Sequence, residues 1–265
     1  MSKPAKRQAA VSALKRGIEV LHCFDSGSHA LSNGEISSLT RVPKPTVTRL
    51  AATLVSLGLM RQDPETEKYS LGAGVLSLAQ SFLSGLDVRA CARPHMHKLA
   101  EAFGGSVFLA ICDGLEMVLI ETCRSRSSML TVRLDVGSRV PIATTALGRA
   151  YLGSLEPSER AQLIEQLQRA SSGDWFRHSA GIEQALRDAE AHGYCASIGE
   201  LRTEINAVAV PLTLPTGERV AINCGGPAFA FPESRLRAEV APRLLAAARA
   251  IAGETGGSIL QPKAA

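Results

Sequence analysis

The stretch Ser32–Gly58, SNGEISSLTRVPKPTVTRLAATLVSLG, decides the fold of the first quarter of the chain. Ser32 and Glu35 have the spacing of a capping box, in which two side chains satisfy each other's free backbone N–H groups at a helix start. This helix must end before Pro43, because a residue that precedes proline is driven out of helical dihedrals. Pro45 fits the first position of a second helix. Gly58, the last residue of the stretch, would end this helix.

We expect these helices to pack through apolar residues at helical spacing. Ile36 and Leu39 would point inward from the first helix. One face of the second helix carries four apolar residues, namely Val47, Leu50, Leu54 and Leu57. A preceding helix over residues 13–24 has a similar stripe, made of Leu14, Ile18 and Leu21. Two short strands, over residues 59–62 and 68–71, surround a polar turn and complete a winged helix-turn-helix.

In this fold the second helix enters the major groove of DNA. Threonine hydroxyls suit phosphates or bases, and the guanidinium of Arg49 can pair with guanine. Other cations would neutralise backbone phosphates. The predicted DNA-binding residues are Arg41, Lys44, Thr46, Thr48, Arg49, Thr53 and Arg61. The plainer alternative is a three-helix packing unit with a solvated basic face.

Charge is distributed unevenly along the chain, which has 265 residues and a net charge of +4. Residues 1–72 hold ten Lys/Arg against six Asp/Glu, whereas the remainder holds nineteen of each. The excess therefore lies in the first quarter, which indicates a module that meets a polyanion. The wing turn carries three acids, so we expect its tip to sit off the phosphates. Length and a 45% hydrophobic content favour two globular domains.

Targeting signals and cofactor motifs are not apparent. The basic N-terminus lacks the apolar segment of a secretory signal, and no apolar run approaches the ~18 residues of a membrane span. The six cysteines are scattered, with no C-x-x-C pair. We therefore expect a reduced, cytoplasmic protein with no membrane association, metal or cofactor.

Several segments together resemble the IclR family of transcriptional regulators. Residues 14–21, 35–50 and 57–60 resemble its DNA-binding domain, and residues 141–152, 193–194, 207–212 and 225–227 resemble landmarks of its effector domain, in order. The resemblance covers nearly the whole chain, from about residue 12 to 253. The expected organisation is a flexible basic arm (1–11), a winged helix-turn-helix domain (12–73), a linker helix (74–90), an effector-binding domain (91–256) and a flexible tail (257–265).

The second domain is predicted to be α+β, with mostly antiparallel strands and helices on one side. Hairpins are expected around Asp113-Gly114 and around residues 215–217. Helices are expected over residues 93–103, 145–155, 157–169, 179–192 and 232–251, with a possible kink at Pro242. The resemblance implies a GAF- or PAS-like sensor of this kind.

The resemblance also implies an effector pocket on one face of the sheet. Its lining would be Met129, Val132, Ala146, Leu147, Ser197, Ile205, Ala207, Asn223 and Gly225, with Glu200 and Asn206 as nearby polar candidates. Ser197 replaces a carboxylate, and Ala207 a cysteine, found in relatives that bind small oxoacids. The size and charge of the ligand therefore stay open. Ordinary core packing is the competing interpretation of every position.

Catalytic motifs give little support to an enzyme. Ser12-Ala-Leu-Lys15 matches the S-x-x-K pattern, but it lies on a helix of the DNA module. Cys91, His95 and His97 could bind metal, although no partner group is evident. No catalytic residues are predicted.

The leading hypothesis is a regulator that binds a palindromic operator as a homodimer or a dimer of dimers and senses a small organic acid, with aromatic acids among the candidates. The alternatives are a small-molecule enzyme with an N-terminal dimerisation module and a regulator that has lost its ligand. Whether binding represses or activates transcription stays open.

Overall fold

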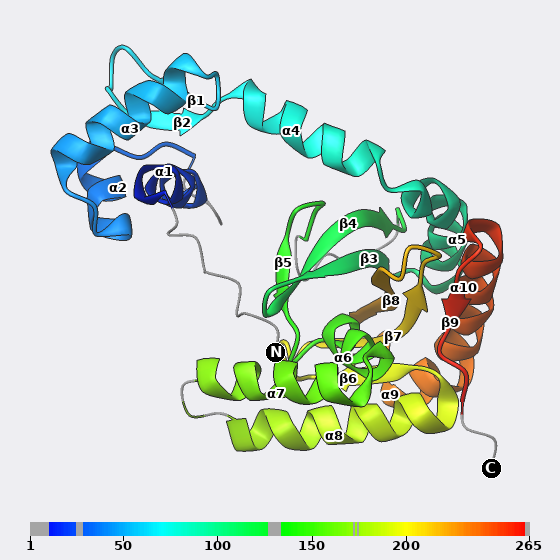
Figure 1. Cartoon of the computed structure of the whole chain (residues 1–265). Coiled ribbons are helices and arrows are strands. Elements are labelled where there is room, and N and C mark those ends of the chain that lie inside the picture. Colours follow the sequence, from blue (N-terminus) through cyan, green and yellow to red (C-terminus); the bar gives the residue numbers. More distant parts are fainter. Residues whose placement is uncertain (1–10, 25–28, 127–133, 172, 174, 263–265) are drawn as a thin grey trace, which may run out of the picture. The chain divides into compact units, whose positions relative to one another are not determined.

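The computed structural model describes residues 11–24, 29–126, 134–171, 173 and 175–262 (Figure 1). The chain divides into two compact units, the first ending at Gly85 and the second beginning at Leu86. Each unit contains its own buried apolar cluster. No helix within these described ranges is long and apolar enough to cross a membrane.

The first unit is a winged helix-turn-helix followed by one further helix, coloured blue to cyan in Figure 1. Its elements are α1 (Ser12–His22), α2 (Asn33–Thr40), α3 (Lys44–Ser56), β1 (Met60–Gln62), β2 (Tyr69–Leu71) and α4 (Ala73–Ser84). The two strands pair antiparallel and form the wing, with Arg61 opposite Ser70. Leu31 adds a single bridge to Tyr69, which ties the start of α2 to the wing.

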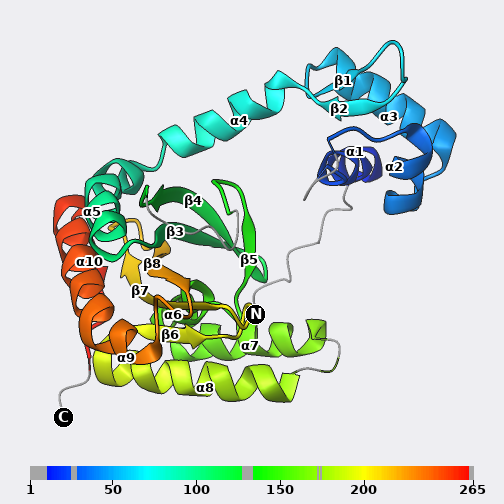
Figure 2. The same cartoon turned by 180° about the vertical axis from the view of Figure 1, so that it is seen from behind.

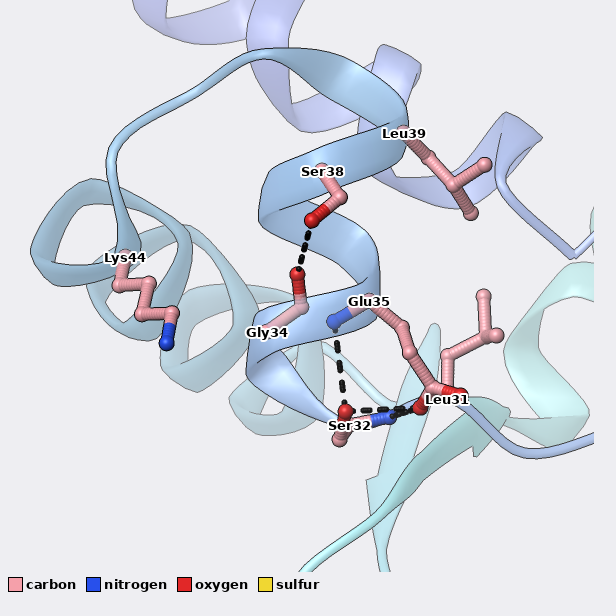
Figure 3. Close-up of a pocket in the computed structure, with 7 residues that line it drawn as sticks. All are labelled: Leu31, Ser32, Gly34, Glu35, Ser38, Leu39 and Lys44. Carbon is pink, nitrogen blue, oxygen red and sulfur yellow. Dashed lines mark hydrogen bonds between the residues drawn. The ribbon is translucent and has the colours of Figure 1, made fainter.

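Local sequence signals set the ends of α2 and α3. The predicted capping box is confirmed: Ser32 Oγ accepts from the Glu35 backbone N–H, and the Glu35 carboxylate accepts from the Ser32 N–H at 2.7 Å (Figure 3). Arg41 ends α2 in the left-handed conformation, with φ 57°. Gly58 follows α3 with φ +72°, as predicted for a glycine after a helix. Helix α3 starts at Lys44, one residue before the predicted start.

The predicted packing faces are partly wrong. Leu14, Leu39 and Leu57 are 67%, 62% and 64% exposed, and Ile18 is also exposed. Helix α1 buries Gly17 and Val20 instead, and α3 buries Ala51 beside Val47 and Leu54. A pattern based on large apolar residues does not mark these small buried positions. Leu14, Ile18 and Leu57 line a groove of about 520 Å³ between α1 and α3.

The second unit is an antiparallel sheet with helices on both faces (Figures 1 and 2). Its strands are β3 (Ser106–Asp113), β4 (Glu116–Arg124), β5 (Arg139–Pro141), β6 (Cys195–Ile198), β7 (Ile205–Thr213), β8 (Arg219–Pro227) and β9 (Ser258–Ile259). Its helices are α5 (Asp87–Phe103), α6 (Ala146–Ser154), α7 (Pro157–Ala170), α8 (Trp175–His192), α9 (Glu233–Arg235), the π-helical turn η1 (Leu236–Val240) and α10 (Ala241–Thr255). The strand order is β5-β4-β3-β8-β7-β6, and β9 pairs with β7.

Helices on one side only were expected, and this was wrong. Phe108 and Ala209 belong to the cluster that contains the buried residues of α6 and α8. The neighbouring residues Leu109 and Val210 point to the other face of the sheet and are equally buried. On that face Glu121 forms ion pairs with two arginines of α5. Because successive side chains of a strand point to opposite faces, continuous apolar strands need cover on both.

Three helix boundaries in this part of the chain differ from the prediction or lie close to a proline. Helices α4 and α5 are separate, because Leu86 has non-helical dihedrals, so the expected linker helix over 74–90 is interrupted. Helix α5 begins six residues before the predicted start and runs through Pro94. Pro94 and Ala90 are exposed, so water can hydrate the Ala90 carbonyl that loses its donor. The π-helical turn η1 ends at Val240, two residues before Pro242, where the kink was predicted.

The expected flexible tail from residue 257 is wrong in its first residues. Ser258 and Ile259 form β9 and pair with Thr213 and Leu212 of β7. Ile259 is buried, and this buried apolar side chain accounts for the order of the segment. Strands β5 and β6 were also not predicted, since each is at most four residues long.

Candidate nucleic-acid interface and effector face

Helix α3 presents one face to the core and the other to solvent. Six of the seven predicted DNA-binding residues are exposed and Thr46 is half-buried. Arg49 lies on the side opposite the buried Val47 and Ala51, because residues two positions away from a buried one fall on another face. The first turn of α3 and the Arg41 turn before it are therefore open to a partner.

The hydroxyls of two predicted DNA-binding threonines are already used within the protein. Thr48 Oγ1 donates to the Lys44 carbonyl at 3.0 Å and accepts from Asn33 Nδ2 at 2.7 Å. Thr53 Oγ1 donates to the Arg49 carbonyl at 3.1 Å. In the free protein these hydroxyl protons are therefore used within α3, and the role of both residues in DNA binding stays a prediction. Asn33, which links α2 to α3, carries no sequence signal that distinguishes it from other helix-start residues.

Two of the cationic side chains near α3, Arg61 and Lys44, have different surroundings. Arg61 Nε donates to Ser70 Oγ at 2.8 Å across the wing, which holds the side chain along the hairpin. Lys44 lies beside α2 and lines an open groove of about 630 Å³ together with Gly34 and Ser38 (Figure 3). Its ammonium is therefore placed at the boundary between the two helices of the motif.

The wing turn is acidic and internally bonded. Asp63 Oδ1 accepts from the Thr66 N–H at 2.8 Å and from the Glu65 N–H at 3.0 Å. The Thr66 backbone bond, followed by its hydroxyl, lowers the pKa of Asp63 below its ordinary value. The tip of the wing therefore keeps its negative charge at neutral pH.

Strand register brings three of the predicted effector residues into one row of the sheet. Ser197 pairs with Ala207, and Ala207 pairs with Gly225. Ser106 pairs with both Gly225 and Arg124, so the row extends from β6 across β7, β8 and β3 to β4. Directly opposed residues in an antiparallel sheet point to the same face. We call this face, on which Ala207 packs with the α6 cluster, the effector face.

Close packing at Gly225 shapes this face. A Cβ at Gly225 would lie 2.4 Å from the Asn206 carbonyl oxygen and 2.6 Å from Ala207 Cβ. Asn223, two residues earlier, lies on the same face, and its Oδ1 accepts from the Phe108 N–H at 2.9 Å. The row therefore carries little side-chain bulk between Ser197 and Arg124.

Helix α6 covers part of the effector face with its first turn. Thr145 Oγ1 caps the helix by accepting from the Gly148 N–H at 3.1 Å. A Cβ at Gly148 would come within 2.2 Å of Ile142 Cα, so only glycine permits this approach. Ala146 and Leu147 are both 2% exposed and belong to the apolar cluster. Both are therefore part of the packed interior that α6 forms with the sheet.

Three polar candidates are committed to internal contacts. Asn206 is a strand neighbour of Ala207 and so faces the other side of the sheet, where its amide bonds the Gly199 N–H and the Phe231 carbonyl. The Glu200 carboxylate pairs with both terminal nitrogens of Arg149. Ser197 Oγ donates to the Thr144 carbonyl at 2.7 Å. Ile205, half-buried on the effector face, starts β7, and Met129 and Val132 lie outside the described residues.

Two arginines near this region were missed by sequence reasoning. Arg149 is 2% exposed and bonds the carbonyls of Ala143 and Ala196 as well as Glu200. Arg124 stands at the β4 end of the row. Nothing in the local pattern marks either residue, because each position depends on strand pairing between distant segments.

Several candidate nucleophiles and metal ligands in the described parts of the chain are buried or engaged in internal contacts. Burial raises the pKa of the Cys195 and Cys224 thiols to about 12, so both stay protonated. His95 bonds Glu254 at 2.8 Å, and within the described residues no three His, Cys, Asp or Glu side chains cluster as metal ligands. Lys15 pairs with Glu19 of its own helix.

A winged helix with an exposed cationic recognition helix, together with a separate α+β unit, defines a two-domain DNA-binding regulator. The chain belongs to the IclR family of bacterial transcriptional regulators. Residues 13–64 match the IclR helix-turn-helix domain, and residues 80–253 match the IclR C-terminal domain. These matches confirm the resemblance and the predicted class of function.

Individual relatives agree with this assignment. The HTH-type transcriptional regulator TsaQ1/TsaQ2 of Comamonas testosteroni is 37% identical over 88% of this chain and 84% of its own length. An IclR family regulator from Brucella abortus is 38% identical, covers 94% of both chains and has a TM-score of 0.83. An IclR homologue from Microbacterium hydrocarbonoxydans, crystallised with 4-hydroxybenzoate, shares the fold at 22% identity, over 92% of this chain and 98% of its own, with a TM-score of 0.72.

Proposed function

We propose that the protein binds a two-fold symmetric operator as a homodimer or a dimer of dimers, and that a small organic acid on the effector face changes this binding. The exposed cationic side of α3, centred on Arg49, carries the DNA part of the proposal. Two-fold operators are read by two-fold proteins, each copy placing one recognition helix in a major groove. The ionised acids of the wing tip favour an orientation in which the tip stays off the phosphates.

An aromatic acid is the first ligand class to test. The structure crystallised with 4-hydroxybenzoate shows that this fold can hold such a molecule. The effector face offers small side chains at Ala207 and Gly225 beside the ring of Phe108. We also propose that the ligand is sensed without turnover, since the Cys195 thiol on this face is protonated and the Glu200 carboxylate is engaged by Arg149.

The DNA proposal is tested with the intergenic DNA beside the gene. Fluorescence anisotropy should show a complex with an even number of chains, and affinity should fall steeply with salt as phosphate contacts release counterions. Footprinting should show two protected half-sites separated by about one helical turn. A single protected site, or equal affinity for unrelated DNA, would contradict a symmetric operator.

Thr48 gives a sharper prediction about base reading. Because its hydroxyl is held by Lys44 and Asn33, the methyl group is the part of the side chain free to contact a base, and thymine offers a methyl partner. Thr48→Ser should lower operator affinity roughly fourfold, the value of one lost methyl contact. Thr48→Val, which keeps the methyl, should lose less. Anisotropy titrations on operator and unrelated DNA measure both, and the reverse order would show that the hydroxyl reads the base.

A further inference from the structure

Arg124 occupies the β4 end of the row that forms the effector face. It pairs with Ser106, which in turn pairs with Gly225. Arg124 and Gly225 therefore lie two strands apart, about 10 Å at the usual strand spacing. An arginine side chain can extend over most of that distance, so its guanidinium can reach a ligand lying above Gly225.

The guanidinium of Arg124 is bonded on one edge only. Nη1 and Nη2 both approach Asp135 Oδ1 at 3.0 Å, and Nη2 also donates to the Leu134 carbonyl. Nε is buried and has no hydrogen-bond partner in the described part of the chain. Buried donors are almost always bonded in native proteins, so an unpartnered guanidinium N–H requires an explanation.

The surroundings of this free edge suit a planar anion. Arg124 Cζ lies 6.0 Å from the centre of the Phe108 ring, and Asn223 bonds the Phe108 N–H through its Oδ1. Within the described residues, Asn223 Nδ2 has no hydrogen-bond partner, so it is a second donor on the same face. Ser106, Gly225 and Ala207, which follow Arg124 along the row, are all small residues. Two N–H donors beside an aromatic wall match a carboxylate attached to a small, flat body.

We propose that Arg124 binds the carboxylate of the effector, with Nε–H as the donor and Asn223 as its neighbour. The proposal rests on the acid-sensing function proposed above and names the residue that recognises the acid. Asp135 is 73% exposed and holds the outer edge of the guanidinium toward solvent. The inner edge is thereby oriented toward the ligand before it binds, which lowers the entropic cost of recognition.

The test compares acids with their neutral analogues on variants of the full chain. Purified protein is titrated calorimetrically with benzoate, 4-hydroxybenzoate, phenylacetate and pyruvate, and with the primary amide of each. We expect at least one acid to bind the native protein and its amide to bind far more weakly. Arg124→Gln should lower the affinity for that acid by about tenfold or more, as expected for a charge-assisted pair.

Controls separate recognition from folding and from DNA binding. Arg139 also pairs with carboxylates, those of Asp113 and Glu116, but it stands on β5 outside the row, so Arg139→Gln should leave acid affinity unchanged. Arg124→Lys keeps the charge without the planar fork and should recover part of the affinity. Both Arg124 variants should unfold cooperatively and still bind operator DNA.

Two results would overturn the proposal. The first is a folded Arg124→Gln variant that binds the acid as tightly as the native protein does. The second is that the native protein binds no acid in the panel. Failure of the DNA-binding function is observed separately, as loss of operator binding by the native protein in the absence of acid.

Discussion

Replacing Arg49 with alanine should lower operator affinity by about tenfold to a hundredfold, the range expected when a bidentate contact to a base is lost. Arg49 is exposed on the open side of α3, so its removal leaves the core of the first unit intact. Thermal unfolding should therefore be nearly unchanged. Anisotropy titrations with labelled operator DNA at fixed salt measure the loss.

Two further variants make the Arg49 result specific. Lys15→Ala removes a cation of the same unit whose side chain is 71% exposed on α1, and it should change affinity only slightly. Arg49→Lys keeps the charge but cannot form the paired contact, so it should bind weakly and discriminate poorly between operator and unrelated DNA. Unchanged affinity in Arg49→Ala would show that α3 is not the recognition helix.

Replacing Arg149 with alanine should destabilise the second unit by about 3 kcal/mol, the lower end of what removing one partner of a buried ion pair costs, because the Glu200 side chain is 25% exposed. The substitution leaves the carbonyls of Ala143 and Ala196 without the Arg149 donor. It also leaves a cavity where the buried side chain lay. A Cβ at Gly181 would lie 2.2 Å from Arg149 Nη2, so α8 is closely fitted to this guanidinium. The side chain thus joins α6, α8 and the residues after β6.

Trp175 provides a selective probe of this effect. It is the only tryptophan in the chain, and it is half-buried against the apolar cluster of the second unit. Urea unfolding followed by its fluorescence therefore reports on that unit alone. Arg169→Ala breaks an ion pair with Glu165 whose arginine is 72% exposed, and it should cost at most about 0.5 kcal/mol. A comparable loss in both variants would contradict a special role for Arg149.

Local signals in the sequence predicted most elements of the fold. The capping box at Ser32, the glycine after α3 and the two hairpins each depend on residues within a few positions, and the structure confirms them. Errors arose where packing overrides pattern. Leu14 and Leu39 follow helical spacing but are exposed, whereas the small residues Gly17 and Ala51 are buried.

The candidate sites were predictable to different degrees. The predicted DNA-binding residues all lie between residues 41 and 61, and six of the seven are exposed. The effector face depends on pairing between segments about one hundred residues apart, as between Phe108 and Asn223. Asn206 and Ala207 are neighbours in the sequence but point to opposite faces of the sheet. The sequence also does not reveal that Glu200 is paired with Arg149. Arg124 could be identified only after the register of five strands was known.

The close approach at Gly225 has a consequence for how ligand preference can diverge among relatives. A larger residue there would push β7 and β8 apart, so the floor of the effector face is fixed at this point. Ala207 and Ser197 stand beside it in the same row, and exchange of either side chain alters shape and polarity without changing the strand register. On the proposed function, a change of ligand preference would therefore come from Ser197 or Ala207, whereas position 225 has to remain glycine.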